Sequence, residues 1–115
     1  MKQRILVMNG QRIVQSEREG SWANDHVTKA GALKPGLYNI FAATTPDKSK
    51  RYQGTIIHGD ESGIYQQIGK QYVVHAVSDF DIVPPIGAAA SITYAANGRA
   101  QVDPLTALLV RGRSR

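Results

Sequence analysis

Two Asn-Gly dipeptides, Asn9-Gly10 and Asn97-Gly98, each separate two runs of β-prone residues. A two-residue type I′ turn needs positive φ at both central positions, and Asn-Gly meets that need at low steric cost. We therefore predict β-hairpins over residues 5–15 and 91–102. A chain with such a hairpin signal near each end is constrained toward antiparallel β-structure.

The middle of the chain gives the same kind of signal. Gly69-Lys70 separates the runs 64–68 and 71–77, with glycine at the first turn position as a type II′ turn requires. Residues 37–42 and 52–58 read as two further strands, and residues 44–50 between them read as a loop. These runs predict a meander.

Two stretches do not fit the hairpin pattern. Residues 16–36 are polar and irregular, and a short helix is predicted only over residues 27–33. Residues 78–89 contain Pro84-Pro85, which cannot sit in a central strand, so they predict a loop that crosses the domain.

The C-terminal end predicts one short helix. Asp103 is a favourable N-cap, Pro104 suits the first helical position, residues 105–110 are mostly apolar, and Gly112 is a terminator. Leu105, Leu108 and Leu109 are spaced for one apolar face.

These signals together predict a mainly β fold, a small antiparallel β-barrel or roll of about seven short strands with a short C-terminal helix. The length of 115 residues favours a single domain over residues 1–102, followed by the helix and a basic tail over 103–115. Basic residues are expected on edge strands, where they discourage pairing between molecules; they are Lys2, Arg4, Arg12 and Arg99.

Composition excludes several classes of chemistry. The chain has no cysteine, which excludes disulfides, thiolate catalysis, iron–sulfur clusters and cysteine-ligated zinc. Its first apolar run, residues 5–8, is much too short for a signal-peptide core or a membrane span. A cytoplasmic protein without a membrane span is expected.

The net charge of +5 is unevenly placed. Three of the 14 basic residues, Arg111, Arg113 and Arg115, lie in the last five positions, so the preceding residues carry only +2. The basic balance therefore describes mainly a tail, and it is weak support for nucleic-acid binding by the folded body.

Metal binding is a first candidate chemistry, because His58, Asp60, Glu61 and His75 come from neighbouring strand ends. Their spacing matches no closed ligand motif, and strand histidines need no ligand role. We therefore expect ordinary polar positions and no metal or other cofactor.

Catalysis is a second candidate. Ser62, His75 and Asp79 could be combined as a hydrolytic triad, and Asp79 with Asp81 as a carboxylate pair. No nucleophile elbow, oxyanion loop or phosphate-binding glycine loop accompanies them. The prediction is therefore a protein that is not an enzyme.

Nucleic-acid binding is a third candidate. Lys48, Lys50 and Arg51 lie in one loop, and Tyr65 and Tyr72 could stack on bases. Tyr52 and the terminal arginines Arg111, Arg113 and Arg115 could add to such a surface. The competing interpretation is that Tyr65 and Tyr72 form a cross-strand pair that stabilises their hairpin.

A protein-interaction module is the remaining candidate. An exposed strand edge or apolar patch would dock a partner, and the predicted helix over residues 105–110 would either pack on the domain or be donated.

Three segments resemble the KfrB family: residues 4–15 (RILVMNGQRIVQ), residues 29–39 (KAGALKPGLYN) and residues 64–70 (IYQQIGK). The likeness runs from about Arg4 to Val102. KfrB-like proteins are small accessory proteins of broad-host-range conjugative plasmids, so the resemblance implies a role in stable plasmid maintenance.

The resemblance also implies partners. KfrB proteins are associated with KfrA, a DNA-binding protein with a long coiled coil, and with KfrC. No functional residue is carried over from the family. We predict a non-enzymatic interaction module of a bacterial plasmid maintenance, segregation or mobilisation system. The alternative is a small barrel that binds single-stranded nucleic acid through Lys48, Lys50, Arg51 and the C-terminal arginines.

Overall fold

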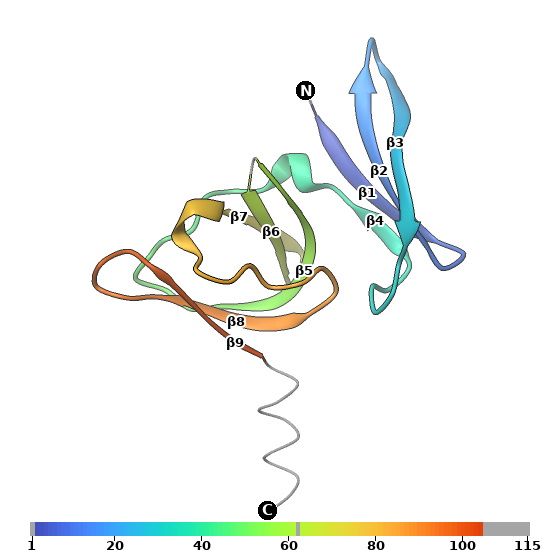
Figure 1. Ribbon diagram of the computed structural model, residues 1–115. Coiled ribbons are helices and arrows are strands. Elements are labelled where there is room, and N and C mark those ends of the chain that lie inside the picture. Colours follow the sequence, from blue (N-terminus) through green and yellow to red (C-terminus); the bar gives the residue numbers. More distant parts are fainter. Residues whose placement is uncertain (1, 62, 105–115) are drawn as a thin grey trace, which may run out of the picture.

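The computed structural model describes residues 2–61 and 63–104, and within them the chain is built almost entirely of antiparallel β-strands (Figure 1). Two single-turn 3-10 helices, η1 (Ile40–Ala42) and η2 (Val77–Asp79), are the helical elements of this part. The nine strands are β1 (Gln3–Met8), β2 (Gln11–Arg18), β3 (Ser21–Lys29), β4 (Gly36–Tyr38), β5 (Tyr52–Asp60), β6 (Gly63–Ile68), β7 (Gln71–His75), β8 (Ala89–Tyr94) and β9 (Ala100–Pro104).

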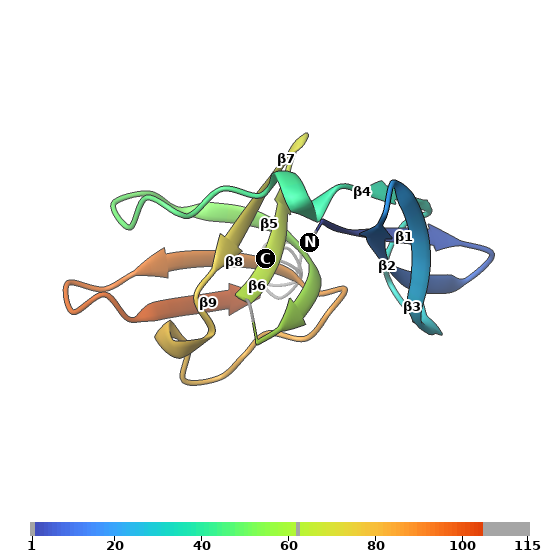
Figure 2. The same ribbon diagram turned by 90° about the horizontal axis from the view of Figure 1, so that it is seen from above.

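The strands form two separate sheets rather than the predicted barrel. The N-terminal sheet has the order β3-β2-β1-β4 and the C-terminal sheet the order β7-β6-β5-β8-β9. Figures 1 and 2 show the two sheets side by side. Because β7 and β9 lie at opposite edges of the second sheet and do not pair, that sheet stays open. The mainly β, antiparallel prediction is confirmed, and the closed barrel is wrong.

The N-terminal hairpin forms as predicted. Asn9 and Gly10 have φ values of 53° and 74°, as a type I′ turn requires, and Gln11 pairs with Met8 across it. The next turn, Glu19-Gly20, has the same signs of φ and leads into β3. Glutamate is unusual at such a turn position, so this second hairpin is not visible in the sequence.

The prediction of an irregular region over residues 16–36, with a helix over 27–33, is therefore wrong for Ser21–Lys29, which form β3. β3 pairs with β2 along its whole length, with an irregularity opposite Val14 and Gln15. β3 is an edge strand with mostly exposed side chains. An edge strand that is exposed to solvent on both faces need not alternate apolar and polar residues. The composition of β3 therefore resembles that of a loop.

Both predicted hairpins of the C-terminal sheet form, but the two-residue turn expected at Asn97-Gly98 is wrong. Gly69 has a φ of 59° between β6 and β7. In the turn between β8 and β9, Gly98 has a positive φ (83°) and Asn97 does not. Here the amides of Gly98 and Ala95 donate to the carbonyls of Ala95 and Arg99, so the loop is longer than a two-residue turn.

Other predictions need correction. The strand expected over residues 37–42 ends at Tyr38, and η1 follows. Asp103 and Pro104 do not begin a helix, because they are the last residues of β9 and Pro104 pairs with Ala90. A proline is tolerated there because β9 is an edge strand. The predicted helix and tail over residues 105–115 lie outside the described residues.

The basic residues expected at edges lie elsewhere. Arg4 is on β1 and Arg12 on β2, the two inner strands of the N-terminal sheet. Lys2 precedes β1, and Arg99 precedes β9 in the turn. Arg12 is also buried, with 5% of its surface exposed.

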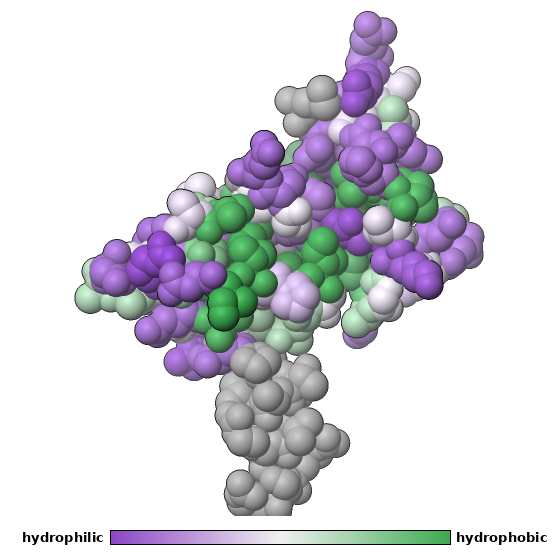
Figure 3. Space-filling view, viewed as in Figure 1, coloured by the Kyte–Doolittle hydropathy of each residue, from purple (hydrophilic) through white to green (hydrophobic). Residues whose placement is uncertain are grey.

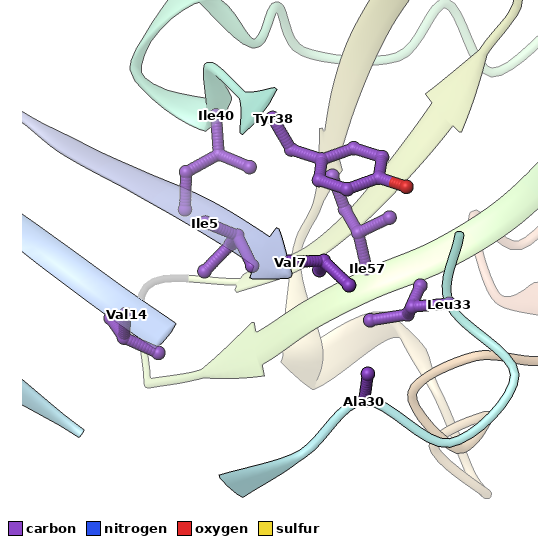
Figure 4. Packing of buried hydrophobic residues seen from close by; sticks show 8 residues of the cluster. All are labelled: Ile5, Val7, Val14, Ala30, Leu33, Tyr38, Ile40 and Ile57. Atoms are coloured by element: carbon purple, nitrogen blue, oxygen red, sulfur yellow. The ribbon is translucent and has the colours of Figure 1, made fainter. Parts of the chain in front are cut away.

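Two apolar clusters lie on opposite sides of β5. The first joins the N-terminal sheet to β5 and contains Ile5, Val7, Val14, Ala30, Leu33, Tyr38, Ile40 and Ile57 (Figure 4). The second lies within the C-terminal sheet and contains Ile56, Ile64, Phe80, Ala90 and Ile92. Ile56 and Ile57 are both fully buried but belong to different clusters. β5 therefore contributes buried residues to both clusters.

Within the described residues, no helix is long and apolar enough to cross a membrane.

Glycine at one position of β5 is predicted to be essential for folding. A Cβ at Gly54 would lie 1.8 Å from the carbonyl oxygen of Gln67, whereas a Cβ at Gly59 on the same strand would meet nothing within 4 Å. We expect Gly54→Ala to lower the free energy of unfolding by about 3 kcal/mol or more, because β5 and β6 must move apart. Gly59→Ala, the matched control, should stay within about 0.5 kcal/mol of wild type. Urea denaturation of both variants checks this, and equal stabilities would contradict it.

Candidate interaction surface

The three cations of the loop before β5 do not form one open site. Lys48 bonds to Asp79 (3.1 Å) and to the carbonyl oxygen of Gly98 (3.3 Å). Its ammonium group also lies 5.2 Å from the centre of the Tyr94 ring. Lys50 and Arg51 are exposed. The loop therefore uses one of its three predicted binding cations to fasten itself to the C-terminal sheet.

The tyrosines proposed as stacking faces are partly used by the fold. Tyr65 faces Val74 and Tyr72 faces Gln67, so Tyr65 and Tyr72 are diagonal neighbours on one face of the hairpin. Both are half-buried and pack against the first apolar cluster. This diagonal placement is the one that the cross-strand interpretation requires.

His58 belongs to a polar cluster that connects the two sheets. The guanidinium of Arg12, on β2, donates to the carbonyl oxygen of Ile57 (3.2 Å) and lies against Nδ1 of His58. Since the guanidinium only donates, Nδ1 must accept and the ring proton sits on Nε2. Nε2 then donates to the Asp60 carboxylate (2.8 Å). Burial lowers the pKa of His58 and Arg12 lowers it further, while Asp60 raises it.

His75 belongs to a second polar cluster, inside the C-terminal sheet. Its Nε2 bonds to the side-chain oxygen of Gln66 (2.9 Å) and its Nδ1 to the hydroxyl of Tyr94 (2.7 Å). Burial lowers the pKa of His75 to about 4 and raises that of Tyr94 to about 12. The neutral imidazole and the neutral phenol are thus held together.

Of the four residues considered as candidate metal ligands, His58 and Asp60 are in contact, but His75 is not part of their cluster. His58 pairs with Tyr65 and His75 with Ile64, and because Ile64 and Tyr65 are consecutive, the two histidines project from opposite faces of the sheet. Glu61 is exposed in the turn. In the described part of the chain, no group of three or more metal-ligating side chains is present.

The candidate catalytic groups are engaged in other contacts. Asp79 pairs with Lys48, Asp81 pairs with Arg99, and both ring nitrogens of His75 are already hydrogen-bonded. Ser62 lies outside the described residues.

The crossing loop after η2 carries the most exposed apolar side chains of the C-terminal half. Arg99 fastens its start by bonding to Asp81 and to the carbonyl of Ser78, and the amide of Gly87 fastens its end by donating to Ile56 (2.6 Å). Between these points Ile82 is 82% exposed. Val83 and Ile86 are also exposed, at 48% and 45%.

The loop forms one wall of an apolar groove of about 400 Å³. Figure 3 shows apolar side chains gathered over the segment between η2 and β8. The other wall comes from the β5–β6 hairpin and η2. The lining residues are Gly59, Asp60, Ile64, Val77, Val83, Pro84, Pro85 and Ile86.

Sequence reasoning identified this loop but not the surface it makes. Pro84-Pro85 correctly predicted a crossing segment without a strand. The apolar residues that flank the prolines were the signal for this surface. An unpaired loop packs against the domain on one side, so some of its apolar side chains stay exposed. This exposed apolar surface is the candidate interaction site of the described residues.

The buried imidazoles make stability depend on pH. The unfolded chain holds His75 near its ordinary pKa of 6.5, while the folded value is about 4. Between these values the unfolded chain binds a proton that the folded chain does not. The free energy of unfolding should therefore fall, by up to about 1.4 kcal/mol per pH unit, as pH drops from 6.5 to 4.

Urea denaturation at several pH values measures this dependence, and His75→Gln should flatten it relative to wild type. A wild-type stability that does not change between pH 6.5 and 4.5 would contradict the burial of a neutral His75.

The His58 cluster predicts opposite pKa changes in two variants. Arg12→Met removes a positive neighbour and should raise the pKa of His58, whereas Asp60→Asn removes a negative one and should lower it. NMR titration of the imidazole measures both. If both variants move the pKa in the same direction, the arrangement is wrong.

A known protein family matches the C-terminal part of the chain. Residues 51–104 match the family model described as the KfrB domain. This range takes in all five strands of the C-terminal sheet and the groove. The resemblance noted for residues 4–15 and 29–39 lies outside it.

One curated relative is Protein TraB of Escherichia coli, 28% identical over 94 residues. The match covers 79% of this chain and 64% of the relative, so the chain spans less than two thirds of that protein. The family match and the C-terminal sheet cover the same part of the chain: residues 51–104 are similar to the KfrB domain and contain all five strands of that sheet.

Proposed function

We propose that this chain is a non-enzymatic protein-interaction module of a bacterial plasmid maintenance, segregation or mobilisation system, working in the cytoplasm with a DNA-binding coiled-coil partner. The match of residues 51–104 to the KfrB domain supports the plasmid role, which the family resemblance implies. KfrA-like and KfrC-like proteins are the partners that the family suggests.

The observation that carries the interaction role is the apolar groove of the crossing loop. Leaving three large aliphatic side chains in water gives up favourable burial, and a partner that covers them recovers about 25 cal/mol for each Å² of apolar surface. Other exposed apolar residues, Met8, Val27 and Leu37, lie on the N-terminal sheet. The groove is favoured because it lies in the KfrB domain.

The placement of the side chains favours this function over the alternatives. Lys48 is engaged in contacts within the fold, and Tyr65 and Tyr72 pack on the core. Among the described residues, the predicted nucleic-acid surface therefore keeps Lys50 and Arg51 as exposed cations. The histidines and aspartates that catalysis would need are already paired within the fold.

Binding to a purified KfrA-like coiled-coil protein tests the proposal. We expect a complex by calorimetry and size-exclusion chromatography, and Ile82→Ser should weaken it about tenfold, because Ile82 is the most exposed apolar residue beside the groove. Leu37→Ser on β4, a similarly apolar and exposed position, is the control and should bind as wild type.

The same samples should be titrated with a single-stranded oligonucleotide at low salt. Tight binding of the oligonucleotide that weakens steeply with salt, together with no binding to the coiled-coil protein, would overturn the proposal.

A further inference from the structure

Aromatic and basic side chains gather where the N-terminal sheet meets η1. The rings of Trp22, on β3, and Phe41, in η1, have their centres 6.0 Å apart. The guanidinium of Arg4, on β1, lies over the Trp22 ring, 4.0 Å from its centre. The ammonium group of Lys2 lies 5.2 Å from the centre of the Phe41 ring. These four side chains, which we call the aromatic patch, come from three segments that are distant in the sequence.

The aromatic patch lies on the outer face of the N-terminal sheet. Neighbouring residues of a strand project to opposite faces, and Ile5 belongs to the first apolar cluster, so Arg4 projects away from that cluster. Nε of Arg4 donates to the side-chain oxygen of Gln15 (2.8 Å), and within the described residues no acceptor bonds to its two terminal nitrogens. Phe41 is 44% exposed. The patch therefore presents free donors and part of an aromatic ring to solvent.

A pocket of about 390 Å³ lies next to the aromatic patch, and its volume is in the range of small-ligand sites. Phe41 of the patch and Ala42 of the pocket are consecutive residues of η1, which contacts both β1 and β7. Figures 1 and 2 show η1 between the N-terminal sheet and β7. The pocket is lined by Asn39, Ala42, Thr44, Lys70, Gln71 and Tyr72.

The patch and the pocket together hold three kinds of group that recognise single-stranded nucleic acid. Aromatic rings stack on bases of any sequence, and cations bind the phosphates. Side-chain amides bond to the edges of unpaired bases. The rings are those of Trp22, Phe41 and Tyr72, the cations are Lys2, Arg4 and Lys70, and the amides are Asn39 and Gln71.

The surface formed by the patch and the pocket is positively charged. No acidic side chain is among the described residues that line the pocket. Glu17 lies opposite Trp22 and Lys2 in the strand register, so one carboxylate stands beside the three cations Lys2, Arg4 and Lys70. Positive charge attracts a phosphate backbone. It would also attract an acidic peptide, but such a peptide has no flat groups to stack on the rings, so the rings favour a nucleic acid.

We infer that the aromatic patch and the adjoining pocket bind single-stranded nucleic acid. Bases stack against the exposed rings while Arg4 and Lys70 hold phosphates, and Lys2, which is exposed, turns from the Phe41 ring toward a phosphate. In a duplex the bases stack on one another, so their faces are not open to the rings. This binding activity goes beyond the proposed function, because it uses neither the apolar groove nor the cations of residues 48–51.

An oligonucleotide titration of the full chain tests the inference. The probes are a labelled single-stranded DNA of about 10 nucleotides, the RNA of the same sequence, and the DNA duplex. By fluorescence anisotropy at low salt we expect a single strand to bind about tenfold tighter than the duplex, and added salt to weaken it. The preference between the DNA and RNA strands identifies which of them is the ligand. Equal binding of single strand and duplex, or no binding of either strand at low salt, would overturn the inference.

Paired variants of the chain locate the binding. Phe41→Leu keeps an apolar side chain but removes the ring, and it should weaken the single strand about tenfold. Arg4→Gln should weaken it by several fold and reduce its salt dependence, while Glu17→Gln should strengthen it. The controls are Lys50→Gln and Arg51→Gln, which remove exposed cations of the loop before β5 and should bind as wild type. An equal loss in Arg4→Gln and in these two controls would contradict the inference.

Two further measurements separate charge from stacking and the inference from the proposed function. A glutamate-rich peptide that displaces the single strand at equal concentration would mean that the surface recognises charge alone, and the inference would fail. Ile82→Ser should weaken the coiled-coil protein and leave oligonucleotide binding unchanged, and loss of both would contradict two separate surfaces. If the coiled-coil protein binds and no single strand does, only the inference fails. If a single strand binds and the coiled-coil protein does not, only the proposed function fails.

Discussion

The side chain of Gln66 makes the interaction on which the C-terminal sheet depends. Its amide nitrogen lies within 3.3 Å of three backbone carbonyl oxygens, those of Tyr52, Gly54 and Ala90, on β5 and β8. Its oxygen accepts from His75 on β7. One fully buried side chain on β6 therefore bonds to three other strands. Since an unpaired buried amide costs about 1–3 kcal/mol, any shift of one strand against the others is penalised.

That network explains the neutral form of His75 and the position of the crossing loop. The imidazole is stacked near Tyr94 and meets Phe80 edge-on, so the residue after η2 is held against the histidine. Phe80 is buried, while the loop that follows turns outward. The polar network inside the sheet thus fixes where the loop begins, and Arg99 and Gly87 fix its two ends.

The sequence predicted the local turns better than the assembly of the strands. Hairpins at Asn9-Gly10, Gly69-Lys70 and Asn97-Gly98 follow from residue types that a turn demands, so a single sequence shows them. The hairpin at Glu19-Gly20 and strand β3 do not, because neither the glutamate nor an exposed edge strand has a distinctive composition. Whether the strands close into a barrel depends on which distant strands pair, and local sequence patterns do not show this.

The same limit applied to the candidate site. His58, Asp60 and His75 were singled out for their chemistry, but sequence spacing could not show that the two histidines face opposite sides of the sheet. Arg12 is expected at a surface edge, but in the structure it is a buried donor between the sheets, bonded to the carbonyl of Ile57. Such a contact joins residues 45 positions apart and leaves no trace in local composition.

The groove follows from the constraints on the crossing loop. A chain leaving η2 must reach β8, and two consecutive prolines prevent its middle from joining a sheet edge on the way. Pro84 is buried, which holds the loop against the domain, and its neighbours on either side are left with one face in water. The second apolar cluster is formed by other residues, among them Ile56, Ile64 and Ile92. Val83 and Ile86 therefore stay about half exposed, and the path of the loop places them beside the groove.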